Sequence, residues 1–147
     1  MAGHRYKRTH GKRASRKKRP DRVPPKPLSY YRIKKPGRCR WCGDKIQESQ
    51  RKRWHADCVR EYRLIYYPSE TRKQIWKRDR GHCAVCGKKD PSWELDHIRP
   101  LYEQKGKKAS DVDLDYWKPG NLQTLCRFCH RDKSAQEATI RSSGRKL

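Results

Sequence analysis

The chain has few of the residues that build a large hydrophobic core. Only 32% of its 147 residues are apolar, and Phe and Met occur once each, whereas 38% are charged. A core made from so few large side chains is thin, and small domains of this kind usually depend on metals or disulfides. We therefore expect metal ions or covalent links to supply part of the stability of the fold.

Long hydrophobic runs are also missing. The longest apolar run covers only residues 64–67, whereas a helix needs about 20 apolar residues to span a bilayer. The sequence also lacks the apolar segment of a secretory signal. We expect a soluble protein without membrane contacts, in the cytoplasm of a bacterial or phage-infected cell or in the nucleus of a eukaryotic one.

Acidic residues are few relative to basic ones. The chain carries 40 Lys and Arg against 16 Asp and Glu, a formal net charge of +24. Residues 1–36 hold 14 of these cations and a single acid, Asp21. A charge excess of this size predicts a nucleic-acid partner. On charge alone, a structural role in an RNA–protein particle stays open.

Residues 1–36 also contain five of the nine prolines. Such a segment buries too little apolar surface to offset its chain entropy, so we predict a disordered basic arm. The arm would anchor nucleic acid by neutralising phosphates. Docking to a protein partner, or targeting to the nucleus through the basic cluster 16–19, is its alternative role.

Cysteine is the most informative residue type. The chain has seven cysteines, and an odd number argues against a closed disulfide framework. His55 lies three residues before Cys58 and completes a set of eight soft ligands, enough for two tetrahedral zinc sites. The predicted ligands are Cys39, Cys42, His55 and Cys58 in the first site, and Cys83, Cys86, Cys126 and Cys129 in the second.

The segment 37–68 contains the first ligand set. Its CxxC pair with a trailing glycine is typical of a zinc knuckle, and a helix is predicted from Trp54 onward with Val59, Tyr62 and Ile65 on one face. A knuckle followed by ligands on a first helical turn resembles a treble-clef zinc finger. We interpret this CCHC zinc module as structural, with direct reading of DNA as the alternative.

The segment 69–147 alternates predicted helices and strands. Ser69 is the predicted N-cap of a helix over 70–80 that turns Ile75 and Trp76 inward. A second knuckle, a strand over 93–97, a polar loop over 99–120, a strand over 122–125 and a helix over 129–140 follow. This order predicts a ββα unit in a small, zinc-stabilised α+β fold.

A specific motif surrounds the tripeptide Asp-His-Ile at 96–98. One CxxC pair precedes it, and Asn121 and a second CxxC pair followed by His130 come after it. This order of residues resembles the HNH endonuclease family in its zinc-stapled ββα-metal form, also called the His-Me finger. The resemblance covers residues 75–138 and includes stand-alone phage and bacterial members as well as modules appended to chromatin-remodeller-like translocases.

The motif residues have the side chains that phosphodiester hydrolysis requires. His97 can act as general base, because a neutral imidazole titrates near working pH. The resemblance makes Asp96 and His130 ligands of a catalytic divalent ion, Mg²⁺ or Mn²⁺, and gives Asn121 the role of holding the His97 loop through backbone hydrogen bonds. Asp96 and His97 point to opposite sides of a regular strand, so both reach one site only if the chain bends there.

Three cations flank the start of the last predicted helix. Arg127, Arg131 and Lys133 are expected to contact phosphates and to fix a duplex across the site. The amides at the N-terminus of that helix add a favourable field for an anion.

Together these features predict a metal-dependent HNH endonuclease that hydrolyses DNA phosphodiester bonds. The resemblance implies double-stranded DNA as substrate, one nick per active site, and products with 5′-phosphate and 3′-hydroxyl ends. We expect a monomer or a weak dimer. The alternative is a non-catalytic zinc-finger protein that binds nucleic acid, which leaves Asp96, His97 and His130 without a role.

Overall fold

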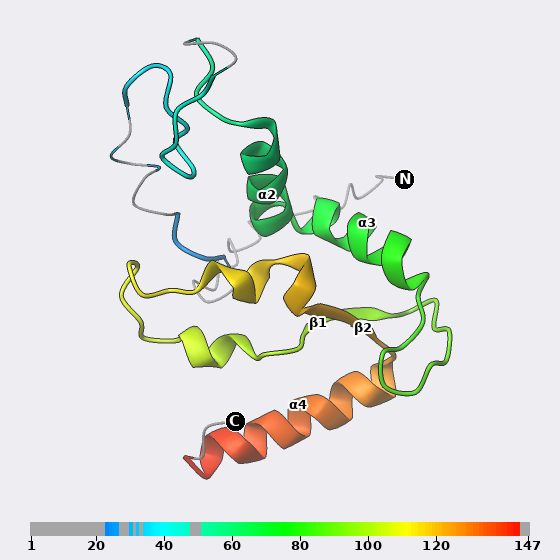
Figure 1. The fold of residues 1–147 in the computed structure, drawn as a ribbon. Helices are drawn as coiled ribbons and strands as arrows, with labels where there is room; N and C mark the ends of the chain where they lie inside the picture. Colours follow the sequence, from blue (N-terminus) through cyan, green and yellow to red (C-terminus); the bar gives the residue numbers. More distant parts are fainter. Residues whose placement is uncertain (1–22, 27–29, 31, 33, 48–50, 145–147) are drawn as a thin grey trace, which may run out of the picture.

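The computed structural model describes residues 23–26, 30, 32, 34–47 and 51–144 (Figure 1). The helices are α2 (Ala56–Tyr66), α3 (Pro68–Asp79) and α4 (Arg127–Ser142), and the strands are β1 (Glu94–His97) and β2 (Leu122–Leu125). Short 3₁₀ turns lie between the strands: η2 (Leu101–Gln104), η3 (Leu114–Trp117) and η4 (Pro119–Asn121). None of the helices in the described part of the chain is long and apolar enough to cross a bilayer.

β1 and β2 form an antiparallel pair at the centre of the molecule. Glu94 lies opposite Leu125, and His97 lies opposite Leu122. α3 packs against β2 from one side of the pair, and α4 runs along the other side (Figure 1). The order strand, connection, strand, helix confirms the predicted ββα unit and the small α+β fold class.

Ile75 anchors α3 on the strand pair. It is fully buried and packs with Trp93 and Leu122. The expectation that Trp76 also points inward is wrong, because its side chain is 40% exposed and stacks on Trp93 at 6.1 Å between ring centroids. Neighbouring residues of a helix point about 100° apart, so one surface fully buries only one of them.

The first residue of α3 differs from the predicted one. Tyr67, and not Ser69, is the N-cap, and Pro68 occupies the first helical position. Proline suits that position because the N–H that it lacks has no partner inside the helix. At the other end Arg80 takes the left-handed conformation, with φ 53°, and its N–H bonds the carbonyl of Trp76.

α2 turns its buried side toward the rest of the molecule at Ile65, which is 7% exposed. Tyr62 is half-buried, whereas Val59 is 39% exposed, so the expectation that Val59 shares the inner face is wrong. Six residues along an α-helix correspond to a rotation of about 120° away from the starting face. That rotation places Val59 at the surface.

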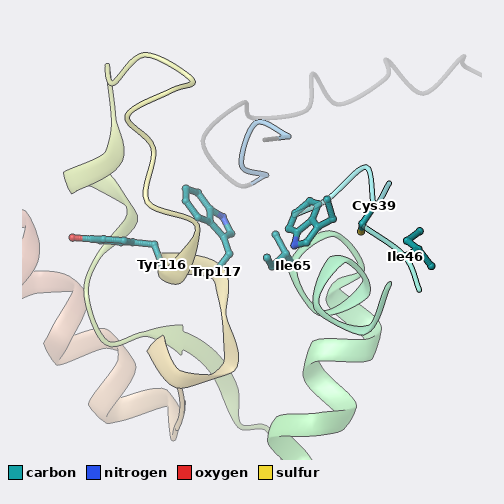
Figure 2. Close-up of a cluster of buried hydrophobic side chains, with 6 residues drawn as sticks. Cys39, Ile46, Ile65, Tyr116 and Trp117 are labelled. Carbon is teal, nitrogen blue, oxygen red and sulfur yellow. The ribbon is translucent and has the colours of Figure 1, made fainter. Parts of the chain in front are cut away.

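A cluster of buried side chains joins the segment 37–68 to the connection between the strands. In Figure 2, Trp117 lies between Tyr116 on one side and Ile65 of α2 on the other. The two segments therefore share a core. Its buried members are Cys39, Trp41, Ile46, Ile65, Tyr116 and Trp117.

The connection 99–120 is not the polar loop that its composition predicts. It contains three 3₁₀ turns, and Tyr116 and Trp117 are each only 7% exposed. Its aspartates lie toward the surface, where the side chains of Asp113 and Asp115 are 43% and 61% exposed. Buried aromatic residues remove about 150–250 Å² each from water, so two of them can fix a segment that is otherwise charged.

Part of the segment 1–36 is packed, which corrects the prediction that the whole of it is disordered. Pro24 is buried, and the hydroxyl of Tyr66 donates a hydrogen bond to the carbonyl of Pro25 at 3.0 Å. Proline has little backbone entropy to lose on docking, which explains how this stretch can pack. Residues 1–22 lie outside the described residues, and for them the arm stays a prediction.

Candidate metal centres and active site

The first predicted zinc set comes together between the knuckle at 37–46 and the start of α2. Its four ligand atoms lie within 4.8 Å of one another. Nδ1 of His55 is 3.4 Å from Sγ of Cys42, and Nε2 of the same ring is 3.3 Å from the carbonyl of Lys45. A histidine that ligates zinc through one nitrogen usually donates the other N–H to such a group. The donor set and its spacing fit a zinc ion.

The second predicted set joins the knuckle at 82–89 to α4. Its four sulfur atoms also lie within 4.8 Å of one another. Sγ of Cys86 and Sγ of Cys126 are 3.8 Å apart, which is about the edge of a tetrahedron of thiolates around zinc. α4 begins at Arg127, two residues earlier than predicted, so Cys126 is its N-cap and Cys129 lies in its first turn. A zinc ion here would fasten the start of α4 to the knuckle.

In the second set the thiol of Cys83 favours the charged form, whereas the neighbouring thiols, Cys126 foremost, raise the pKa of Cys129 to about 12. Burial by itself raises the pKa of the Cys83 thiol, but hydrogen bonds from backbone amides, those of Cys86 and Cys126 foremost, outweigh it and lower the pKa to about 6. A thiolate is the form that binds metal. Backbone amides of the knuckle and of the α4 N-cap therefore stabilise one thiolate of the set.

Asp96 lies on the face of β1 that points to α4, with its side chain only 13% exposed. Its two carboxylate oxygens have different neighbours. Oδ2 accepts a hydrogen bond from Nε2 of Gln123 at 3.0 Å and lies 3.0 Å from Nζ of Lys133. Oδ1 faces His130, with 3.7 Å to Nε2 of that ring. One oxygen is thus held in place while the other is directed at the imidazole.

His130 lies in the first turn of α4, next to the zinc-set residue Cys129. Nδ1 of its ring is 2.8 Å from Oε2 of Glu94, and Nε2 is the atom that faces Asp96. A carboxylate on Nδ1 fixes the tautomer that leaves the Nε2 lone pair free for a metal. The structure therefore forms a chain from Glu94 through His130 to Asp96.

A divalent ion fits between Asp96 and His130. Within the described residues, the only groups of three or more close metal-ligand side chains are the two zinc sets, so this pair offers two protein ligands. Mg²⁺ is commonly bound by one or two protein ligands and keeps several waters. The separation of 3.7 Å between Oδ1 of Asp96 and Nε2 of His130 lets one ion contact both atoms.

Lys133 lies within the site, one turn along α4 from His130. Its Nζ donates to the carbonyl of His97 at 2.8 Å and also pairs with Asp96 and Glu137. Burial alone lowers the pKa of Lys133, but the hydrogen bonds to Glu137 and Asp96 raise it above its ordinary value. The expected phosphate contact of Lys133 would compete with these bonds.

His97 is the last residue of β1 and is half-buried. The strand stays regular through His97, and the chain bends only at Ile98, so side-chain alternation directs His97 away from the face that carries Asp96. In the described part of the chain, no hydrogen bond or ion pair holds its ring. Burial lowers the pKa of His97, with a smaller contribution from the charge of Lys133, although Asp96 opposes the shift. The imidazole is therefore neutral at neutral pH, as a general base must be.

Asn121 braces the chain just after His97. Its Oδ1 accepts from the amide of Arg99 at 2.8 Å, and its Nδ2 donates to the carbonyls of Arg99 at 3.1 Å and Tyr116 at 2.9 Å. All of these partners are backbone atoms of the connection between the strands. Asn121 thus ties the end of β1 to η3 and has no direct contact with the Asp96–His130 pair.

Arg127 and Arg131 are exposed at the start of α4. The guanidinium of Arg131 lies 5.6 Å from the ring centre of Phe128, whose side chain is 69% exposed. Both arginines are therefore available to an anion in solution, in contrast to Lys133.

Two residues of the site, Glu94 and Gln123, were not predicted from the sequence. Glu94 precedes Asp96 by two positions, and residues two apart in a strand share a face. That signal was present in the sequence, because the segment was predicted as a strand. The contact from Gln123 to Asp96 depends on the register of β1 against β2, which the sequence does not show.

Glu94→Ala is expected to weaken the binding of Mn²⁺ to the zinc-loaded protein about 10- to 100-fold, because loss of a partner that orients a metal-ligating histidine has that effect. Glu94→Gln keeps a hydrogen-bond acceptor and should lose less Mn²⁺ affinity than Glu94→Ala. Titration followed by electron paramagnetic resonance of free Mn²⁺ measures both affinities.

Glu70→Ala is the matched control, since Glu70 forms an ion pair of similar exposure with Arg63, away from the site. Equal Mn²⁺ affinity of Glu94→Ala and the wild type would contradict the role assigned to Glu94.

Comparison with known proteins gives a family match for the segment that carries the Asp96–His130 pair. Residues 83–136 match the family model described as HNH endonuclease. That segment contains the second zinc set, both strands and the first part of α4, and the match confirms the resemblance drawn from the motif.

The same region is similar to curated proteins named DNA annealing helicase and endonuclease ZRANB3. The mouse protein is 46% identical over 55 residues, and the human protein is 39% identical over 54 residues. Each alignment covers 37% of this chain and 4% of the relative, so the chain spans only a small part of the length of these relatives. No solved structure matches the chain significantly.

Proposed function

We propose that this protein is a metal-dependent endonuclease that nicks DNA, because residues 83–136 match the HNH endonuclease family. The observation that carries the proposal is the pair of Asp96 and His130, with Oδ1 and Nε2 at 3.7 Å and each side chain oriented by a further partner. The pair lies beside a complete set of four cysteines, so neither residue is needed to hold the structural zinc.

Hydrolysis of a phosphodiester requires a base that activates water and positive charge near the leaving oxygen, in line with each other across phosphorus. His97 is neutral and unpaired, and it accepts the proton of the attacking water at its free ring nitrogen. A divalent ion on Asp96 and His130 would supply the positive charge. The bend that begins at Ile98, directly after His97, would let the imidazole turn toward a phosphate held at the ion.

Charge around the site supports DNA as the substrate. Arg127 and Arg131 are exposed where α4 begins, and the chain as a whole carries a net charge of +24. We propose that these arginines contact phosphates on either side of the scissile bond, and that residues 1–22 add non-specific affinity. One site cuts one strand, and the products would carry 5′-phosphate and 3′-hydroxyl ends.

Both cysteine sets would hold structural zinc in the active protein. Each set provides four ligand atoms, and the second fastens the helix that carries His130. A zinc-binding protein without catalysis would need both sets but not the chain from Glu94 to Asp96. That chain is the specific observation that favours an enzyme.

Supercoiled plasmid is expected to turn into nicked circles when it is incubated with the protein and Mg²⁺ or Mn²⁺, and a brief excess of EDTA should stop the reaction. Linear product should appear only after nicks accumulate. Asp96→Asn, which keeps shape but loses charge, serves as the paired variant. Unchanged supercoiled plasmid with every divalent ion tested would show that the non-catalytic alternative holds.

A further inference from the structure

The outer side of the segment 37–68 carries a hollow that the nuclease chemistry does not use. We call it the aromatic pocket. It has a volume of about 450 Å³ and lies on the exposed face of α2. The residues that line it are Tyr30, Trp54, Val59, Tyr62, Arg63 and Tyr67.

Large apolar groups are exposed in this pocket. Tyr67 is 51% exposed and Val59 is 39% exposed. The ring of Tyr62 forms the floor, with centroids 5.8 Å from Trp54 and 6.2 Å from Tyr67. Rings in such an open arrangement can accept a further flat group that packs against them.

Cations surround the same rings. Nζ of Lys26 lies 4.1 Å from the ring centre of Tyr30 and 5.5 Å from that of Tyr62, and the guanidinium of Arg40 lies 4.8 Å from Tyr30. Arg63 lines the pocket itself, but its charge is paired with Glu70 at 2.8 Å, so Lys26 and Arg40 form the positive rim. The pocket therefore combines an aromatic floor with a positive rim, which selects a ligand that is flat and attached to negative charge.

We propose that the aromatic pocket binds an unpaired nucleotide of the DNA substrate, with the base against the rings of Tyr62 and Tyr67 and its phosphate near Lys26 and Arg40. Aromatic platforms with cationic rims bind single-stranded nucleic acid in this way, because every base has a face that stacks. The proposal deepens the proposed function and rests on it. It assigns to the enzyme a substrate that contains an unpaired segment, such as a single-stranded tail or a bulge.

The positive charge argues against a protein partner as the occupant. An apolar peptide would bury the rings but leave Lys26 and Arg40 without an anion, whereas Arg63 already pairs with Glu70. A nucleotide satisfies both the rings and the cations. A protein partner would leave DNA binding unchanged when the pocket is altered, and the experiment below distinguishes the two.

The test compares two DNA substrates of equal length, a perfect duplex and the same duplex with a short single-stranded tail that contains 2-aminopurine. Binding is followed by fluorescence anisotropy without added divalent ion, so that the DNA stays intact. The wild type should bind the tailed DNA more tightly and quench the 2-aminopurine. Tyr67→Ala should weaken binding of the tailed DNA at least about 5-fold, which corresponds to the loss of one base–aromatic stack, and it should leave the perfect duplex unaffected.

Three further variants distinguish a pocket effect from a general effect. Tyr67→Phe keeps the ring and should behave as the wild type does. Val59→Glu places a carboxylate in the pocket, and Val85→Glu makes the same change at an exposed valine of the second knuckle, 68% exposed. Only Val59→Glu should lower the preference for the tailed DNA.

The outcomes separate this inference from the proposed function. If the wild type nicks plasmid but binds both DNAs equally, the pocket does not hold an unpaired nucleotide. The same conclusion follows if Tyr67→Ala loses the same affinity for both DNAs. If Tyr67→Ala has no effect on either DNA, the pocket is not a DNA site. If the wild type binds neither DNA and does not nick plasmid, the proposed function itself is wrong.

Discussion

Replacing His97 with alanine should lower the rate of plasmid nicking about 10²- to 10⁴-fold, the usual effect of losing a general base. His97 is the only histidine on the strand pair, and burial lowers its pKa so that the ring is neutral and can accept a proton. Zinc content and DNA affinity should stay nearly unchanged, since the ring belongs to neither zinc set.

His82→Ala is the control for this experiment. His82 is exposed beside Cys83, its Nδ1 lies near the carbonyl of Asp79 at 3.1 Å, and it has no hydrogen bond to Asp96 or His130. The His82→Ala variant should nick plasmid at the wild-type rate. If His97→Ala nicks within about threefold of the wild type, another group activates the water.

The elements that the sequence predicted well are those with short-range signals. Ligand spacing within each CxxC pair, the alternation over 93–97 and the helical pattern over 70–80 all depend on residues a few positions apart. The structure accordingly gathers both predicted cysteine sets and forms both strands. α3 and α4 each start two residues earlier than predicted, because Pro68 occupies the first position of α3 and Cys126 is the N-cap of α4.

The burial of the connection 99–120 could not be predicted in the same way. Tyr116 and Trp117 are buried in a cluster that also contains Trp41 and Ile65, which lie more than 50 residues earlier in the chain. The local sequence pattern shows mainly charged residues between positions 103 and 115. The contact between the segment 37–68 and the connection 99–120 is therefore a property of long-range packing.

For the active site, the motif gave the residue types and the structure added their orientations. Asp96 and His130 meet across β1 and α4, as the motif order suggested, but the division of the Asp96 oxygens between Lys133 and His130 follows from the register of three elements. Lys133 was expected to face phosphate, and the structure shows it bonded to Asp96 and to the carbonyl of His97. The spacing of the motif residues in the sequence does not show how the side chain of Lys133 is oriented.

Cys126→Ser should unfold the nuclease core and abolish nicking. Structural zinc contributes about 10–16 kcal/mol to the folding of small zinc modules, which is comparable to the whole stability of a typical domain, about 5–15 kcal/mol. Cys126 is 7% exposed and is the N-cap of α4, so loss of the zinc would free the helix that carries His130.

Serine is a favoured N-cap residue, so Cys126→Ser keeps the helix start and removes only the thiolate. The zinc content should fall from two ions to one per chain, and near-ultraviolet circular dichroism from Trp93 should be lost. Cys39→Ser provides the comparison, because it should also remove one zinc while the second set, which holds α4, stays intact. A Cys126→Ser protein that keeps its thermal transition and still nicks plasmid would mean that packing of Ile75, Trp93 and Leu122 is sufficient to hold the strands and α4 in place without zinc.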